Sequence, residues 1–208
     1  YKMKFLYLHI NKCGGTSILE WMKAHGINHE NLGHNIIHAS EFEDDFIYFT
    51  TVRNPYNRLA SHYYQWELNH FWSRDITSPD KMINKLRQID FYNSNKETKM
   101  IKMEHLTGGT CLDYRHCSKS PKFFEPCSSW IKGNPGRYRI FKLEEMEKVE
   151  DFIKDFAGLK HTSTLAKHRA RSTTTRRKTS YRLEYSKENQ RFIQEVFKED
   201  FENYGYDI

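Results

Sequence analysis

The sequence predicts an α/β fold in which helices flank a central parallel sheet within one domain. Residues 4–10 (KFLYLHI) are rich in β-forming residues and run into a glycine turn, after which apolar residues recur at helical spacing. Residues 46–52 (FIYFTTV) form a second such strand, also followed by a turn and a helical pattern. Repeated strand–turn–helix units are typical of parallel sheets, whose ligands bind at the carboxyl ends of the strands. We therefore expect both turns to lie at one edge of the sheet.

The helices follow from their start signals and apolar spacing. Thr16 is expected to cap the first helix, which continues through residues 18–23 (ILEWMK). Pro55 suits the first turn of a second helix. Four more helices are expected, at residues 81–87, 96–105, 146–156 and 187–197. One more short strand is expected at residues 139–142. The helix over 146–156 is amphipathic, with an apolar side formed by Val149, Phe152, Ile153 and Phe156.

The composition bounds the class of protein. The chain has 208 residues, of which 38% are hydrophobic and 15% aromatic, so it is a folded protein rather than a disordered one. No apolar run reaches the roughly 20 residues that a membrane span needs. The net charge of +6 favours a polyanionic partner, such as a nucleotide, an anionic glycan or a nucleic acid, with an ordinary basic surface as the alternative. Met3 fits a start codon in a cytoplasmic protein, and equally a trimmed domain from the Golgi lumen. The oligomeric state is open.

The four cysteines do not predict a metal site. They are Cys13, Cys111, Cys117 and Cys127, and they include no CxxC pair, so zinc fits poorly and no metal is expected. Free thiols in a reducing compartment and one loop disulfide, either Cys111–Cys117 or Cys117–Cys127, both remain open.

The first turn has the features of an anion-binding loop. Residues 12–17 (KCGGTS) pass from a strand into a helix, so several backbone N–H groups and the helix dipole point toward one place. The two glycines allow a close approach of the backbone, and Lys12 adds a mobile charge. A plain glycine turn is the alternative. The lysine precedes the glycines, unlike in the ATP-binding pattern GxxxxGK[ST], which argues against ATP-driven phosphoryl transfer. The residues expected to bind the anion are Lys12, Cys13, Gly14, Gly15, Thr16 and Ser17.

Two motifs resemble a known family. Residues 9–17 (HINKCGGTS) resemble the 5′-phosphosulfate loop of carbohydrate sulfotransferases, usually HIPKxGGTS, with Asn11 in place of proline. Residues 52–64 (VRNPYNRLASHYY) resemble the family's 3′-phosphate motif, RNPxxRLxSxYY. Residues 181–206 resemble the end of bacterial and Golgi members, and the heparan sulfate 2-O-sulfotransferase-like group is nearest. The resemblance implies a P-loop-like sulfotransferase fold.

The same resemblance implies an activity. It implies transfer of a sulfuryl group from PAPS (3′-phosphoadenosine 5′-phosphosulfate) to an acceptor hydroxyl, with a glycan as the favoured acceptor and PAP as the product. Arg53 and Ser61 are expected to bind the 3′-phosphate, which ATP lacks. Arg58 either supports them or is a solvated helix residue. Lys12 is expected to stabilise the bridging oxygen as the sulfuryl group leaves it.

A general base is expected between the two motifs. Relatives carry a histidine shortly before the second strand. His38 is therefore the first candidate for the base, His34 the second and Glu41 the third. A neutral histidine suits proton abstraction near pH 7. The alternative for His38 is a helix cap.

Two further regions are expected to shape the site. Residues 73–136 match the family poorly and are expected to form an insertion around the acceptor. The basic loop, residues 160–182, is expected to close on the nucleotide or grip an anionic acceptor through Arg176, Arg177 and Lys178, with a solvated loop as the alternative. Five aromatic residues either floor a sugar cleft or pack in the core: Tyr63, Tyr64, Trp66, Phe71 and Trp72.

Two other functions compete with sulfuryl transfer. A P-loop-like nucleotide kinase predicts ATP binding and dependence on Mg²⁺. A basic nucleic-acid-binding domain predicts steep salt dependence. The sequence has no interleaved aromatic and basic binding signature, so a nucleic-acid partner is not expected.

Overall fold

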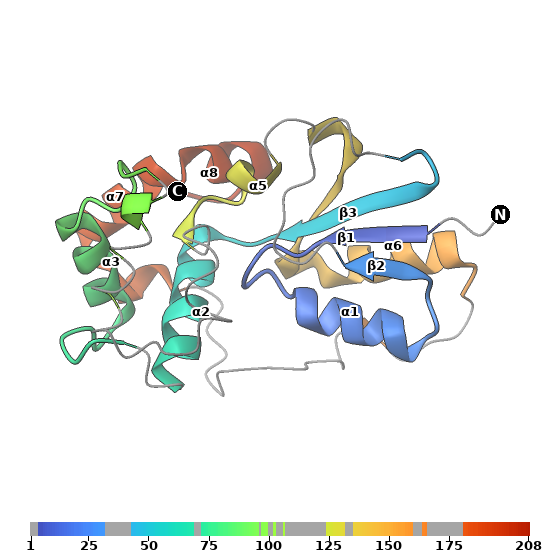
Figure 1. The fold of residues 1–208 in the computed structure, drawn as a ribbon, viewed down its shortest axis with the longest axis horizontal. Helices are drawn as coiled ribbons and strands as arrows, with labels where there is room; N and C mark the ends of the chain where they lie inside the picture. Colours follow the sequence, from blue (N-terminus) through green and yellow to red (C-terminus); the bar gives the residue numbers. More distant parts are fainter. Residues whose placement is uncertain are drawn as a thin grey trace. The chain divides into compact units, whose positions relative to one another are not determined.

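The computed structural model describes ten stretches of the chain (Figure 1): residues 4–31, 43–68, 72–95, 97–99, 102, 106, 124–131, 135–159, 164–165 and 181–208. The chain divides into two compact units, each made of two separate segments. Unit 1 comprises residues 1–53 and 127–172, and unit 2 comprises residues 54–126 and 173–208. The expectation of a single domain over residues 1–208 stays a prediction.

Unit 1 contains a parallel sheet, which has four strands within the described residues (Figure 1). Their spatial order is β2 (His29–Asn31), β1 (Lys4–Leu8), β3 (Phe46–Val52) and β4 (Arg139–Lys142). Leu8 is in register with Thr50, and Val52 with Lys142, so β1, β3 and β4 end at the same edge. The predicted fold class is therefore confirmed, and β3 and β4 have the predicted bounds.

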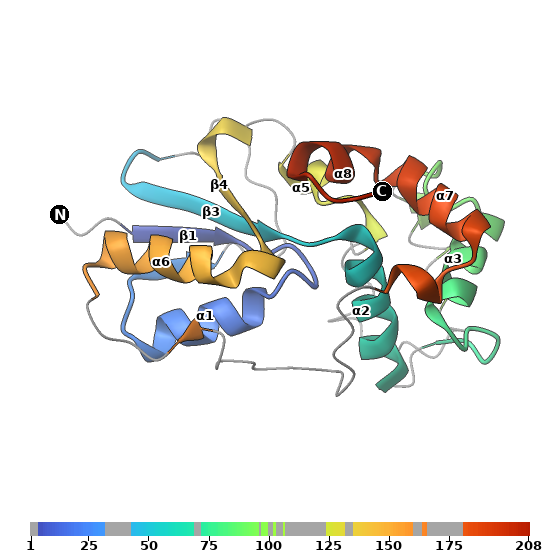
Figure 2. The same cartoon turned by 180° about the vertical axis from the view of Figure 1, so that it is seen from behind.

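Two amphipathic helices cover one face of this sheet. Side chains alternate along a strand, so Phe5, Tyr7 and Phe49 point to the same face. Against them pack α1 (Gly15–Ala24) and α6 (Met146–Ala157), the latter in front of the sheet in Figure 2. The helix residues that complete this core are Ile18, Trp21, Met22, Val149 and Ile153. The shorter elements of unit 1 are α5 (Ser128–Ile131), η3 (Pro135–Arg137) and η4 (Leu143–Glu145).

One residue on the predicted apolar side of α6 is exposed. Phe156 keeps the apolar spacing of the helix but is 52% exposed. Its ring contacts Phe152, with 5.1 Å between centroids, and Phe152 is itself only partly buried at the rim of the core. The apolar spacing therefore does not by itself bury Phe156, although the next residue, Ala157, packs against the core.

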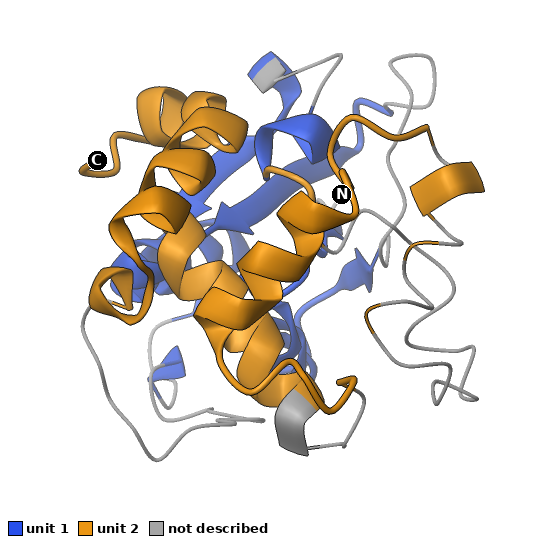
Figure 3. Ribbon diagram, turned by 90° about the vertical axis from the view of Figure 1, so that its left-hand side faces the viewer, with its two compact units in different colours: residues 1–53, 127–172 blue, residues 54–126, 173–208 orange. Residues whose placement is uncertain are grey.

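Unit 2 is helical in its described part (Figure 3). Its elements are α2 (Pro55–Leu68), α3 (Pro79–Gln88), η6 (Arg182–Glu184), α7 (Lys187–Val196) and α8 (Lys198–Tyr204). The predicted helix over residues 96–105 lies mostly outside the described residues. No helix within the described ranges combines the length and the apolar character that a bilayer span requires.

The aromatic residues after the second motif belong to the core of unit 2. Tyr63 and Trp66 are buried, while Tyr64 and Trp72 pack partly buried against the same cluster. The rings of Tyr63 and Trp72 stack, with their centroids 5.8 Å apart. Core packing is therefore the correct alternative for Tyr63 and Trp66, and Phe71 lies outside the described residues.

Candidate functional site

The strand order creates a topological switch point between β1 and β3. From β1 the chain passes through α1 to β2 on one side, whereas β3 lies on the other side of β1. Connections that depart in opposite directions leave a crevice at the carboxyl ends of the two strands, which is where open α/β sheets bind ligands. Lys12 follows β1 and Arg53 follows β3, so the two predicted turns begin at this crevice.

Arg53 and Lys12 are in direct contact there. The Arg53 guanidinium donates from Nη1 to the main-chain oxygen of Lys12, at 3.3 Å. Both side chains are half-buried. The contact brings the arginine of the second motif to the main chain of the first, although the two residues are 41 positions apart.

The backbone of the first loop contains two residues in an unusual conformation. Lys12 and Gly14 both adopt left-handed conformations, with φ of 63° and 85°. A left-handed conformation costs a residue with a side chain about 1–2 kcal/mol. Such strain persists only where the surroundings impose it, and turns of this kind collect backbone N–H groups into anion-binding concavities. A side chain at Gly14 would also clash with Leu143, so the loop needs glycine there.

The start of α1 adds further N–H groups. The helix begins at Gly15, and the N–H groups of Ser17 and Ile18 donate to the carbonyl of Gly14, at 3.1 and 3.3 Å. By helical geometry the N–H groups of Gly15 and Thr16 have no acceptor within the helix, and the helix dipole makes this end positive. The prediction that Thr16 is the N-cap is wrong, because Gly14 in its left-handed conformation occupies that position and Thr16 lies inside the first turn.

A third strand brings another cation to this edge, which sequence analysis missed. Lys142 is the last residue of β4, in register with Val52, and is half-buried. The available signal was a lysine at the end of a predicted strand. Basic residues therefore come from the ends of β1, β3 and β4. Within the described ranges, no cluster of three or more histidine, cysteine or acidic side chains could hold a metal ion.

A crevice with backbone N–H groups and basic side chains can hold phosphate-like groups. The comparison with protein families identifies the class of reaction. Residues 1–207 match the model of the sulfotransferase family. The chain belongs to the sulfotransferase family. No curated protein and no solved structure matches it. This sulfotransferase is thus a transferase of sulfuryl groups, which favours the predicted class of reaction over the kinase and nucleic-acid-binding alternatives.

Cys13 contributes to the loop of this sulfotransferase through its main chain. Its side chain is fully buried, and its Sγ lies 3.8 Å from Sγ of the buried Cys127. Both carry free thiols. Cys111 and Cys117 lie outside the described residues, so the alternative Cys111–Cys117 disulfide stays a prediction.

The rest of the second motif forms α2 in unit 2. The Asn54 side chain accepts from the N–H of Tyr56 at 3.0 Å and so caps the helix, which begins at Pro55 as predicted. Arg58 is 1% exposed and donates to the Glu125 main-chain oxygen at 2.5 Å, so it is not a solvated helix residue. Ser61 is half-buried on α2.

Several predicted site residues lie outside the described part of the chain. These are His34, His38 and Glu41, the candidates for the base, and Arg176, Arg177 and Lys178 of the basic loop. Their roles stay predictions.

Proposed function

We propose that this sulfotransferase takes its sulfuryl group from PAPS and transfers it to an acceptor hydroxyl, with PAP and a sulfate ester as products. The contact between Arg53 and the Lys12 carbonyl carries the proposal. It joins two motifs with phosphate-binding chemistry at one switch point, and PAPS has phosphate groups at both its 5′ and 3′ positions. ATP has no 3′-phosphate for the second motif.

The first loop supplies the chemistry at the sulfuryl group. The N–H groups at the start of α1 and the charge of Lys12 bind the 5′-phosphosulfate. Negative charge develops on the bridging oxygen as its bond to sulfur breaks, and Lys12 stabilises that charge. The loop and the bound nucleotide also align the sulfur for in-line attack.

The second motif and the basic loop select the nucleotide. Arg53 and Ser61 bind the 3′-phosphate through a guanidinium and a hydroxyl, and the residues of 176–178 add positive charge to the same nucleotide. The acceptor we propose is a glycan hydroxyl, which the sequence resemblance supports. Transfer of labelled sulfate to a carboxylated polysaccharide, and not to a tyrosine-containing peptide, is the result expected for this acceptor class.

A comparison of nucleotides tests the donor. We expect PAP to raise the melting temperature more than AMP, and ATP to raise it no more than AMP. Arg53→Ala removes the advantage of PAP over AMP, because the 3′-phosphate loses its guanidinium. Arg139→Ala is the matched control, since this exposed arginine begins β4 in register with Phe49, three residues before the edge that carries the loops. Stabilisation by ATP equal to that by PAP, or an unchanged PAP response in Arg53→Ala, contradicts the proposal.

A second experiment tests the base. His38→Ala should lower turnover by about 10²–10⁴-fold, the usual contribution of general-base catalysis, while PAP binding is kept. His34→Ala is the matched control and should retain most activity. Full turnover in His38→Ala would move the role to His34 or Glu41.

A further inference from the structure

We infer that Tyr7 and Thr51 form a buried relay that orients the main chain of the anion-binding loop, an inference that rests on the proposed donor site. Tyr7 lies on β1 and Thr51 on β3, and both are fully buried. Full burial keeps both side chains from direct contact with a ligand, so both are positioning residues for sulfuryl transfer.

The direction of the relay follows from its proton count. The Tyr7 hydroxyl lies 2.5 Å from Thr51 Oγ1, and Thr51 Oγ1 lies 2.6 Å from the main-chain oxygen of Cys13. A carbonyl oxygen only accepts, so the single proton of Thr51 goes to Cys13. Tyr7 must then donate to Thr51. The chain of donation therefore runs from Tyr7 through Thr51 to the loop.

The environment keeps Tyr7 in the form that can donate. Burial raises the pKa of Tyr7 well above its ordinary value of 10.0, and the hydrogen bond with Thr51 opposes this only in part. The phenol therefore stays protonated throughout the neutral range, and the relay keeps its direction.

Fixing the Cys13 carbonyl also fixes the next N–H group. A peptide unit is planar and trans, so the carbonyl of Cys13 and the N–H of Gly14 point in opposite directions. The relay turns this carbonyl toward β3, which directs the Gly14 N–H away from the strand. Arg53 holds the preceding carbonyl, that of Lys12, in the same manner. Two successive peptide units of the loop are thus set by side chains at the end of β3.

This restraint matters because the loop is otherwise easy to rearrange. Glycine adopts left- and right-handed conformations almost equally well, so the peptide unit before Gly14 can rotate. A rotated unit would present its carbonyl, the negative end of the dipole, to the bound phosphate. The relay excludes that arrangement before the ligand arrives, and so acts on affinity for the 5′-phosphate group.

Ligand-selective binding tests the relay against a purely structural role. Thr51→Val keeps the shape of the side chain and removes its hydroxyl. We expect it to weaken PAP and adenosine 5′-phosphate by about tenfold in Kd, the effect of roughly one hydrogen bond. Adenosine 3′-phosphate, which does not reach the loop, should bind with unchanged Kd.

Companion variants sharpen the result. Thr51→Ser keeps the hydroxyl and should restore PAP affinity to within about twofold of the original, while Tyr7→Phe should weaken PAP by about threefold. The double variant Tyr7→Phe/Thr51→Val should bind PAP no worse than Thr51→Val, because both changes act through one carbonyl. If Thr51→Val does not fold, Tyr7→Phe carries the same comparison of nucleotides.

The failures are distinguishable. Equal losses for both adenosine monophosphates, or unchanged PAP affinity in Thr51→Val and Tyr7→Phe, would overturn the relay and leave the donor assignment intact. A failure of the unaltered chain to bind PAP at all would overturn both.

Discussion

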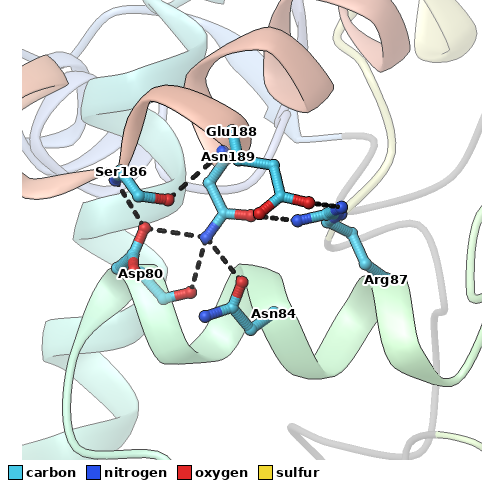
Figure 4. A network of polar contacts seen from close by, with 6 residues as sticks. All are labelled: Asp80, Asn84, Arg87, Ser186, Glu188 and Asn189. Carbon is cyan, nitrogen blue, oxygen red and sulfur yellow. Dashed lines mark hydrogen bonds and ion pairs between the residues drawn. The ribbon is translucent and has the colours of Figure 1, made fainter.

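In unit 1 the buried hydroxyls of Tyr7 and Thr51 end on the carbonyl of a loop, whereas in unit 2 a buried amide joins two helices (Figure 4). Asn189 on α7 is fully buried and donates to the main-chain oxygen and Oδ1 of Asp80 on α3, at 3.1 and 2.7 Å. It also donates to Asn84 at 2.9 Å.

The remaining bonds of this network tie the same two helices together. The Asn189 oxygen accepts from Arg87 at 3.0 Å, Arg87 also pairs with Glu188, and Asp80 accepts from the N–H of Ser186 at 2.7 Å (Figure 4). A network whose bonds run between two helices stabilises their packing. One that ends on a loop carbonyl orients the backbone for a ligand. Changes in the first should therefore affect stability, and changes at the second should affect binding and turnover.

The largest effect is expected at Lys12. Lys12→Ala should lower turnover with PAPS at least 10²–10³-fold, about the effect of losing one group that stabilises developing charge. The melting temperature without ligand should hardly change, because the Lys12 side chain is only half-buried and contributes little to the packed core. Lys23→Ala, at the exposed end of α1, the helix that follows the loop, is the control. Normal turnover in Lys12→Ala would contradict the proposal that Lys12 stabilises the charge that develops on the bridging oxygen.

The second effect is expected in unit 2. Asn189→Ala removes a fully buried amide together with its hydrogen bonds to Asp80, Asn84 and Arg87, and should lower the free energy of unfolding by about 2–4 kcal/mol in urea denaturation. PAP affinity of the folded protein should be unchanged. Arg191→Ala, at an exposed position on the same helix, is the control and should shift stability by less than about 0.5 kcal/mol. If Asn189→Ala weakened PAP as much as Thr51→Val does, the distinction between the two networks would fail.

The smallest effect is expected on the pH dependence of stability above about pH 10, where one buried tyrosine from each unit contributes. Burial raises the pKa values of Tyr7 and Tyr185 above the ordinary 10.0. Above about pH 10 the unfolded chain releases phenolic protons that the folded protein keeps, so stability falls as pH rises and is constant in this respect below that pH. Tyr7→Phe and Tyr185→Phe should each reduce this slope by about 1.4 kcal/mol per pH unit. Only Tyr7→Phe should also weaken PAP. An unchanged alkaline slope would contradict the burial argument.

Much of the fold was predictable because it rests on local patterns. The bounds of β3 and β4, the start of α2 at Pro55 and the helix at α6 follow from apolar periodicity and turn residues. Errors came where packing overrides the pattern. At Thr16 the left-handed Gly14 takes the capping position, and at Phe156 the apolar spacing falls on a side chain that is 52% exposed.

By itself the sequence determined the class of fold and the two loops that belong at the ends of parallel strands, since both depend on neighbouring residues along the chain. Only the tertiary structure decided the strand order that makes the switch point and brings Lys142 to the edge. It also decided the relay, whose members Tyr7 and Thr51 are 44 positions apart. Periodicity reports which face of an element is apolar, but a hydrogen bond between distant strands depends on register and on the packing of the whole unit.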